Sequence, residues 1–189
     1  MSGFSTAQVA AMTAAQVKAL KTEQLQALSS DQIKAIETGD LAAMTASQVA
    51  AFSSNQIRAL STGQLNALTA TELNALSDTQ LQSLSTTQVN GMSSSSVAKL
   101  KATQVAALST AQVAAMTTDQ VKALSVLSVA ALSANQLNAM TTTQVQSLTA
   151  NQLKALGSTT VAALNTTQVA ALSTAQVAGL SVASLAALS

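Results

Sequence analysis

The chain contains no cysteine, histidine, tryptophan, tyrosine or proline, and its only aromatic residues are two phenylalanines. Without cysteine it can form no disulfide, no thiolate zinc site and no redox centre. Without histidine it also lacks the most common general base and a common metal ligand. These absences predict a protein that is not an enzyme and that binds no cofactor and no metal ion.

Charge is also scarce. The 189 residues include 8 basic and 7 acidic side chains, for a net charge of +1. A nearly neutral chain without aromatic stacking platforms is poorly suited to binding nucleic acid. No apolar run approaches the roughly 18 residues that a membrane helix needs. We therefore expect no nucleic-acid partner and no membrane insertion.

The dominant feature is an eight-residue repeat. From Ser5 to Leu188 the sequence divides without a gap into 23 octets with the consensus [ST]-[TA]-x-Q-[VLI]-x-A-[LM]. Position 5 is always Val, Leu or Ile, and position 8 is Leu or Met except at Ile36 and Phe52. This register predicts one domain over residues 5–188. The start, MSGFSTAQ, lacks the features of a signal peptide, so residues 1–4 are expected to be a disordered, cloning-derived start on a fragment.

Each octet carries the signals that begin a helix. Ser or Thr at position 1 is a preferred N-cap, and Gln three residues later completes a capping box. Because this signal recurs every eight residues, each octet is predicted to form one helix of about six residues that ends at the next cap. Such short helices are unstable alone. The expected fold is therefore an all-α, tight solenoid with a Val/Leu core.

Two other folds compete with this prediction. In a single long helix, eight residues leave a drift of about 80° per octet, so the apolar stripe would spiral around the helix. In a β-solenoid, positions 5 and 8 would point to opposite faces of a strand. Both are less favoured than the solenoid of short helices.

On a helix, positions 5 and 8 lie about 60° apart and define the inner face, whereas positions 3 and 6 point outward. The charges follow this division, because no charged residue occupies position 5 or 8. Position 7 is Ala in 18 of the 23 octets. A small residue there would let the helices of successive turns stack closely.

Six octets lack Gln at position 4, namely octets 5, 9, 12, 16, 20 and 23. Their mean spacing, 18 octets over five intervals, predicts about 3.6 octets per superhelical turn. The same edge carries apolar residues at outward positions, which suggests a self-association seam or a partner groove. The predicted seam consists of Asp40, Glu72, Ser96, Val126, Leu127, Ser128, Thr160, Val182 and Ser184. A merely flattened edge, or a truncated end at Val182, explains these residues equally well.

The octet ETGDLAAM brings two acids close together in sequence. Glu37 occupies its cap position and Asp40 its Gln position. Paired-acid catalysis needs a cleft, which a solenoid with a filled core does not provide. We therefore expect these two residues to cap the helix.

Octets such as STAQVAAM, TTDQVKAL and ETGDLAAM resemble the degenerate octapeptide tracts of very large bacterial surface or secreted proteins. The resemblance covers residues 5–188. It implies an extracellular or cell-surface stalk, spacer or adhesive region, here as a fragment without its export signal. A binding module for a protein or glycan partner is the alternative. Ice binding is less favoured, because the Thr residues at positions 1 to 3 are irregular.

Overall fold

A computed structural model describes residues 3–188 of the chain. Within this range it contains 23 short helices and no strand, and no octet is without a helix. Residue contacts divide the chain into two compact units, residues 1–92 and 93–189, and the boundary falls between octets 11 and 12. The repeat register continues through both units. Whether they act as the single predicted domain stays a prediction, and each unit is described by itself.

The helices of unit 1 are α1 (Thr6–Ala10), α2 (Ala14–Ala19), α3 (Thr22–Gln26), α4 (Ser30–Ala35), α5 (Thr38–Leu41), α6 (Ala46–Ala50), α7 (Ser54–Ala59), α8 (Thr62–Ala67), α9 (Ala70–Leu73), α10 (Asp78–Ser83) and α11 (Thr86–Gly91). The helices of unit 2 are α12 (Ser94–Ala98), α13 (Ala102–Ala107), α14 (Thr110–Ala114), α15 (Thr118–Ala123), α16 (Val126–Ala130), α17 (Ala134–Ala139), α18 (Thr142–Ser147), α19 (Ala150–Lys154), α20 (Ser158–Val161), α21 (Thr166–Ala170), α22 (Thr174–Gly179) and α23 (Val182–Ala186). Each helix spans four to six residues of one octet, as the capping pattern predicted.

The corners between helices use only extended backbone. Leu60, which follows α7, has φ −60° and ψ 137°, and the next residue, Ser61, has φ −70° and ψ 160° before α8 begins. Among the described residues no φ is positive, so no corner requires glycine. This backbone explains how a chain with six glycines and no proline turns after every octet.

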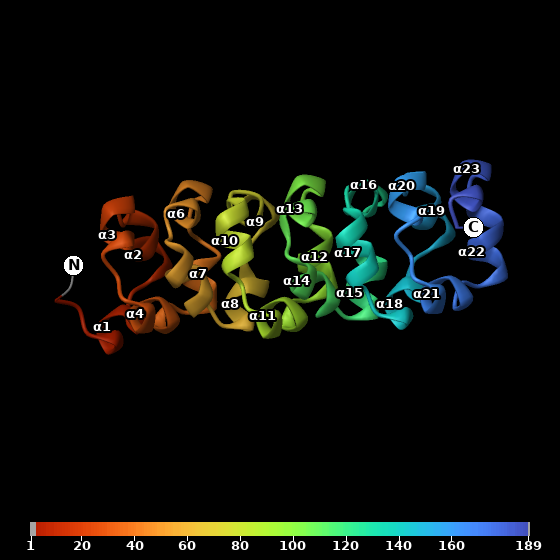
Figure 1. The fold of residues 1–189 in the computed structure, drawn as a ribbon. Coiled ribbons are helices and arrows are strands. Elements are labelled where there is room, and N and C mark those ends of the chain that lie inside the picture. The colour runs from red at the N-terminus through yellow and green to blue at the C-terminus, as the bar shows by residue number, and fades with distance from the viewer. Residues whose placement is uncertain (1–2, 189) are drawn as a thin grey trace. The chain divides into compact units, whose positions relative to one another are not determined.

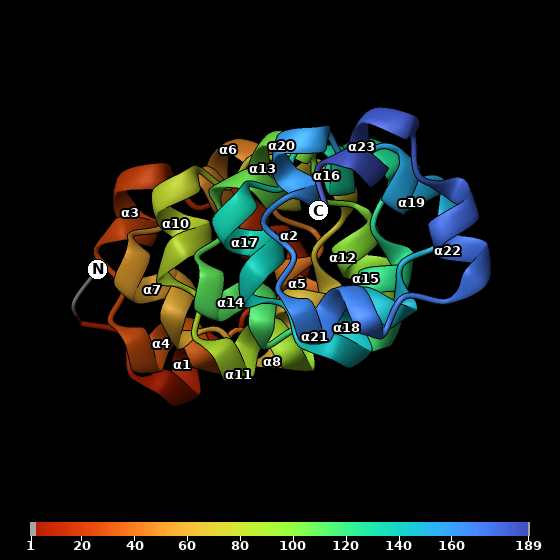
Figure 2. The same cartoon turned by 45° about the vertical axis from the view of Figure 1, so that its right-hand side comes forward.

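Helices stack three octets apart within each unit. In unit 1, α1 packs on α4, α4 on α7, and α2 on α5; the first of these pairs lies side by side in Figure 1. In unit 2, α18 packs on α21 and α20 on α23, and both pairs stay adjacent in Figures 1 and 2. Hydrogen bonds described below join octets four apart. A chain linked at both intervals has between three and four octets per turn, which agrees with the predicted value of about 3.6.

The core consists of the side chains at positions 5 and 8, as predicted. Val17, Ile33 and Leu137 at position 5 are fully buried, and so is Leu68 at position 8. Burial weakens in the last turn of unit 2, where Val177 is 40% and Leu185 48% exposed, because no further turn of this chain packs on them. The solenoid therefore gains its stability from stacking between turns.

Position 7 packs closely on position 2 of the octet three before it. At Gly91 in α11, an added Cβ would lie 2.5 Å from Cγ2 of Thr62 in α8. At Gly179 in α22, it would lie 3.2 Å from Cβ of Ala150 in α19. This close approach explains why position 7 is nearly always Ala, Gly or Ser. It agrees with the prediction that a small residue there lets the helices of successive turns stack closely.

The first described residues already take part in the repeat geometry. The side-chain amide of Gln32 donates a hydrogen bond to the carbonyl of Phe4, 28 residues earlier. Phe4 thus takes the place of a position 8 residue in a preceding octet. The predicted disordered start covered residues 1–4, but this bond places Phe4 in the repeat geometry; residues 1 and 2 lie outside the described range.

Candidate functional site

The predicted capping box forms in most octets of the described chain. In octet 18 the Thr141 backbone N–H donates to Oε1 of Gln144 at 2.7 Å, and the Gln144 backbone N–H donates to Oγ1 of Thr141 at 3.2 Å. Every described octet that combines a Ser, Thr or Asn cap with Gln or Glu at position 4 closes both bonds. Position 4 therefore fixes the start of its own helix.

The same glutamine also binds the previous turn, which the sequence interpretation missed. Nε2 of Gln144 donates to the backbone carbonyls of Val113, Ala114 and Met116, at 3.0, 3.2 and 2.6 Å. These carbonyls lie 28 to 31 residues earlier, at the end of the octet four before. We call this set of Nε2 bonds the glutamine clamp. It recurs at Gln48, Gln56, Gln64, Gln80, Gln88, Gln136, Gln152, Gln168 and Gln176.

The preference for Gln over Glu was the available signal for the clamp. A capping box accepts either residue at its last position. Yet position 4 is Gln in 17 of the 23 octets and Glu only at residue 72. Both side chains can offer an oxygen to the cap, but only the amide can also donate to a carbonyl. The clamp thus adds donors to carbonyl groups at a helix end, where intrahelical partners run out; of the three that Gln144 reaches, the Val113 carbonyl also accepts from the Met116 N–H.

Some position 6 side chains tie the turns together in the opposite direction. Nδ2 of Asn138 donates to the carbonyl of Ala163 at 2.7 Å, and Nε of Arg58 donates to the carbonyl of Ser83 at 3.0 Å. Both acceptors are 25 residues later, at position 7 three octets on. Position 6 lies on the outer face as predicted, but these residues also help to hold the fold.

The octets without Gln have no clamp amide at position 4. Ser96, Ser128 and Ser184 are buried, and each bonds to the hydroxyl of its own cap serine. Glu72 is buried, whereas Asp40 and Thr160 are half-buried. Because they are buried in the folded chain, the side chains of Glu72, Ser96, Ser128 and Ser184 cannot contact a partner directly.

The other seam residues are exposed. Leu127 is 75% and Val126 45% exposed on α16, and Val182 is 87% exposed on α23. All three belong to unit 2, whereas Asp40 and Glu72 belong to unit 1. Whether these apolar side chains bind a second copy or another partner stays a prediction.

Glu37 and Asp40 do not cap α5 with their side chains. Glu37 occupies the N-cap position, but its carboxylate makes no capping hydrogen bond, and the octet closes no capping box. The prediction of structural capping is wrong here. Glu has a longer side chain than the preferred N-cap residues Ser, Thr, Asn and Asp, and it is not among them.

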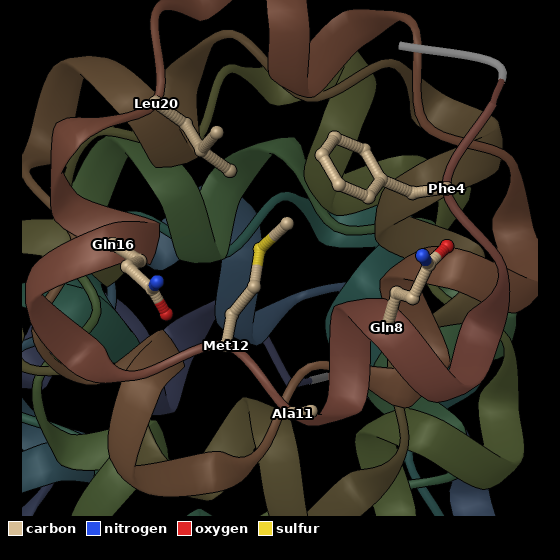
Figure 3. Close-up of a pocket in the computed structure, with 6 residues that line it drawn as sticks. All are labelled: Phe4, Gln8, Ala11, Met12, Gln16 and Leu20. Carbon is tan, nitrogen blue, oxygen red and sulfur yellow. The ribbon is translucent and has the colours of Figure 1, made fainter.

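A pocket of about 430 Å³ opens at the N-terminal turn of unit 1 (Figure 3). Figure 3 shows the Phe4 ring and the Met12 and Leu20 side chains around it, with the amides of Gln8 and Gln16 at its sides. The pocket is lined by Phe4, Gln8, Ala11, Met12, Gln16 and Leu20. None of these side chains is ionisable, so the pocket offers no general acid, base or nucleophile.

No helix in residues 3–188 is both long and apolar enough to span a bilayer. Within the same residues, acidic side chains do not gather in groups of three that could hold a metal ion.

A family model described as the ALTTAQ repeat matches four segments of the chain, residues 1–35, 33–70, 96–126 and 150–182. These segments together span well over half of the 189 residues. The recurrent matches show that the chain carries a repeat tract. No curated protein is significantly similar to it.

Proposed function

The chain belongs to the ALTTAQ repeat family, and from this premise we propose that it is a non-enzymatic structural tract. Its role would be that of a stalk, spacer or display region in a bacterial surface or secreted protein. The extracellular setting is supported by the resemblance of its octets to the tracts of such proteins.

The observation that carries this proposal is that the side-chain bonds between turns end on backbone atoms. The Gln144 amide donates to backbone carbonyls, so it can bind any octet that presents its carbonyls in the same place, whichever side chains that octet carries. The position 6 bond of Asn138 likewise ends on a backbone carbonyl. Turns joined in this way can be added or removed without new side-chain complementarity. A fold that does not depend on the side chains of each added turn is suited to a region whose function depends on its length.

A non-enzymatic role is further supported by the chemistry of the surface. The outward positions 3 and 6 vary widely between octets, whereas position 5 stays Val, Leu or Ile. Variation outside a constant interior is expected when shape is selected rather than a reaction site.

The test is to lengthen the tract in register. A copy of residues 109–164, seven octets, is inserted after Leu164, which adds about two turns. We expect unchanged helicity per residue and an increase of about 16–20 Å in the maximum dimension, at about 8–10 Å per turn of stacked helices. Circular dichroism and solution X-ray scattering on the same samples measure both quantities.

An insertion out of register is the matched control. A copy of residues 109–160 ends in the middle of an octet and should lower helicity and stability around the junction. If the in-register insert also loses helicity, or if the added octets do not extend the particle, the spacer proposal is contradicted.

Exposed apolar residues favour binding as a second candidate function. Leu127 at 75% and Val182 at 87% exposure are unusual on a surface where outward positions are mostly polar or small. Exposed apolar patches mark contact sites more often than chance. A protein or glycan adhesin would use such a surface.

We expect Leu127→Lys to abolish any self-association that the wild-type chain shows in analytical ultracentrifugation, because it places a charge in the proposed contact. Ala111→Lys, at the same octet position of α14, is the control and should leave the sedimentation coefficient unchanged. Equal dimerisation of all three proteins would remove Leu127 from the contact surface.

A further inference from the structure

Glu72 is the only charged side chain that is buried among residues 3–188, with 2% of its surface exposed. It occupies position 4 of octet 9, where most octets have the clamp glutamine. No ion pair to Glu72 forms within the described range. A buried carboxylate normally has a charged partner or coordinates a metal ion.

Only one of its two carboxylate oxygens is satisfied. The Thr69 backbone N–H donates to Oε2 at 2.6 Å, and the Glu72 backbone N–H donates to Oγ1 of Thr69 at 3.3 Å. The capping box of α9 is therefore complete. The other oxygen, Oε1, is buried without any hydrogen-bond partner.

The neighbouring octets indicate what Oε1 faces. In the octets on either side, the atom that corresponds to it is the Nε2 of Gln64 or Gln80, which donates to backbone carbonyls 28 to 31 residues earlier at 2.6 to 3.3 Å. Glu72 has no N–H to donate, so at the same offsets an oxygen meets oxygens. The corresponding carbonyls belong to Leu41, Ala42 and Met44, at the end of α5.

We propose that this buried group of oxygen atoms is a binding site for a monovalent cation, Na⁺ or K⁺. Carboxylate and carbonyl oxygens are the ligands that hard cations prefer. Carbonyls at helix ends and in loops bind Na⁺ and K⁺ in other proteins. The charge argues for a monovalent ion, because one carboxylate balances one positive charge. The cation takes over the role of the missing amide hydrogens and joins octet 9 to octet 5.

This site goes beyond the proposed spacer function and does not depend on it. All its groups lie within unit 1. The composition predicted no metal ion, because it reveals side-chain ligands but not backbone carbonyls brought together by a turn of the solenoid.

Thermal unfolding in different chloride salts tests the site. The wild-type chain and Glu72→Gln are melted in NaCl, KCl and choline chloride at constant ionic strength, with circular dichroism as the readout. For the wild type, each tenfold rise in Na⁺ or K⁺ above the dissociation constant should raise the midpoint by about 3–5 °C. The more effective salt identifies the preferred ion. Glu72→Gln restores the clamp, so its midpoint should be independent of the cation and higher than that of the wild type in choline.

Two further variants sharpen the result. Glu23→Gln removes an exposed carboxylate and should keep the wild-type cation dependence. Gln64→Glu creates a second site of the same geometry and should increase the dependence of the melting midpoint on Na⁺ or K⁺. An identical response of the wild type and Glu72→Gln to Na⁺ and K⁺ would overturn the proposal.

Discussion

In a buffer without Na⁺ or K⁺, Gln144→Glu is expected to destabilise the chain by about 3–5 kcal/mol, because a buried charge is then left without a partner. The substitution keeps the oxygen that accepts from the Thr141 N–H, but it replaces Nε2, which donates to three carbonyls of octet 14. A carboxylate oxygen in that place faces three carbonyl oxygens in a site that is 2% exposed. Urea denaturation followed by circular dichroism measures the loss.

Two other variants separate charge from hydrogen bonding. Gln144→Met removes both kinds of bond without adding charge and should cost less than Gln144→Glu. Gln16→Glu makes the same change at an exposed position in the first turn, where no octet of this chain lies four before it, and should be nearly neutral. A similar loss at positions 16 and 144 would show that loss of the clamp bonds does not cause the effect.

Leu108→Ala is expected to cost about 2–5 kcal/mol, because it leaves a cavity between stacked turns. Leu108 occupies position 8 of octet 13 and is 5% exposed, and its carbonyl accepts a clamp bond from Gln136 at 2.7 Å. The midpoint of chemical denaturation reports the change. Leu185→Ala, at a site that is 48% exposed, is the matched control and should cost much less. A loss below about 1 kcal/mol at Leu108 would contradict its place in the core.

The helices and their caps could be predicted from the sequence, because they depend only on residues that are close together in the chain. A cap such as Thr141 and its partner Gln144 are three residues apart, so one octet contains the whole signal for its helix. Burial of positions 5 and 8 follows from helical geometry in the same way. The number of octets per turn was also predictable, because the mean spacing of the octets without Gln, 3.6, falls between the three octets that separate stacked helices and the four that the clamp spans.

The second bond of the clamp could not be read from one octet, because donor and acceptor lie up to 31 residues apart. The octets without Gln were interpreted as a surface seam, whereas the structure places position 4 between turns and buries Ser96 and Ser128. Only the scarcity of Glu pointed to the amide. The oxygen atoms around Glu72 were equally hidden, since three of them belong to the backbone.

The direction of the clamp has a consequence for the order in which the chain is made. Each clamp glutamine binds carbonyls that were synthesised before it, as Gln176 does with Val145 and Leu148. A nascent chain that leaves the ribosome N-terminus first therefore finds its acceptors already in place. Because the bonds span about four octets, folding can follow synthesis turn by turn, without waiting for distant segments. A tract of this kind could grow to great length without slowing the folding of any one turn.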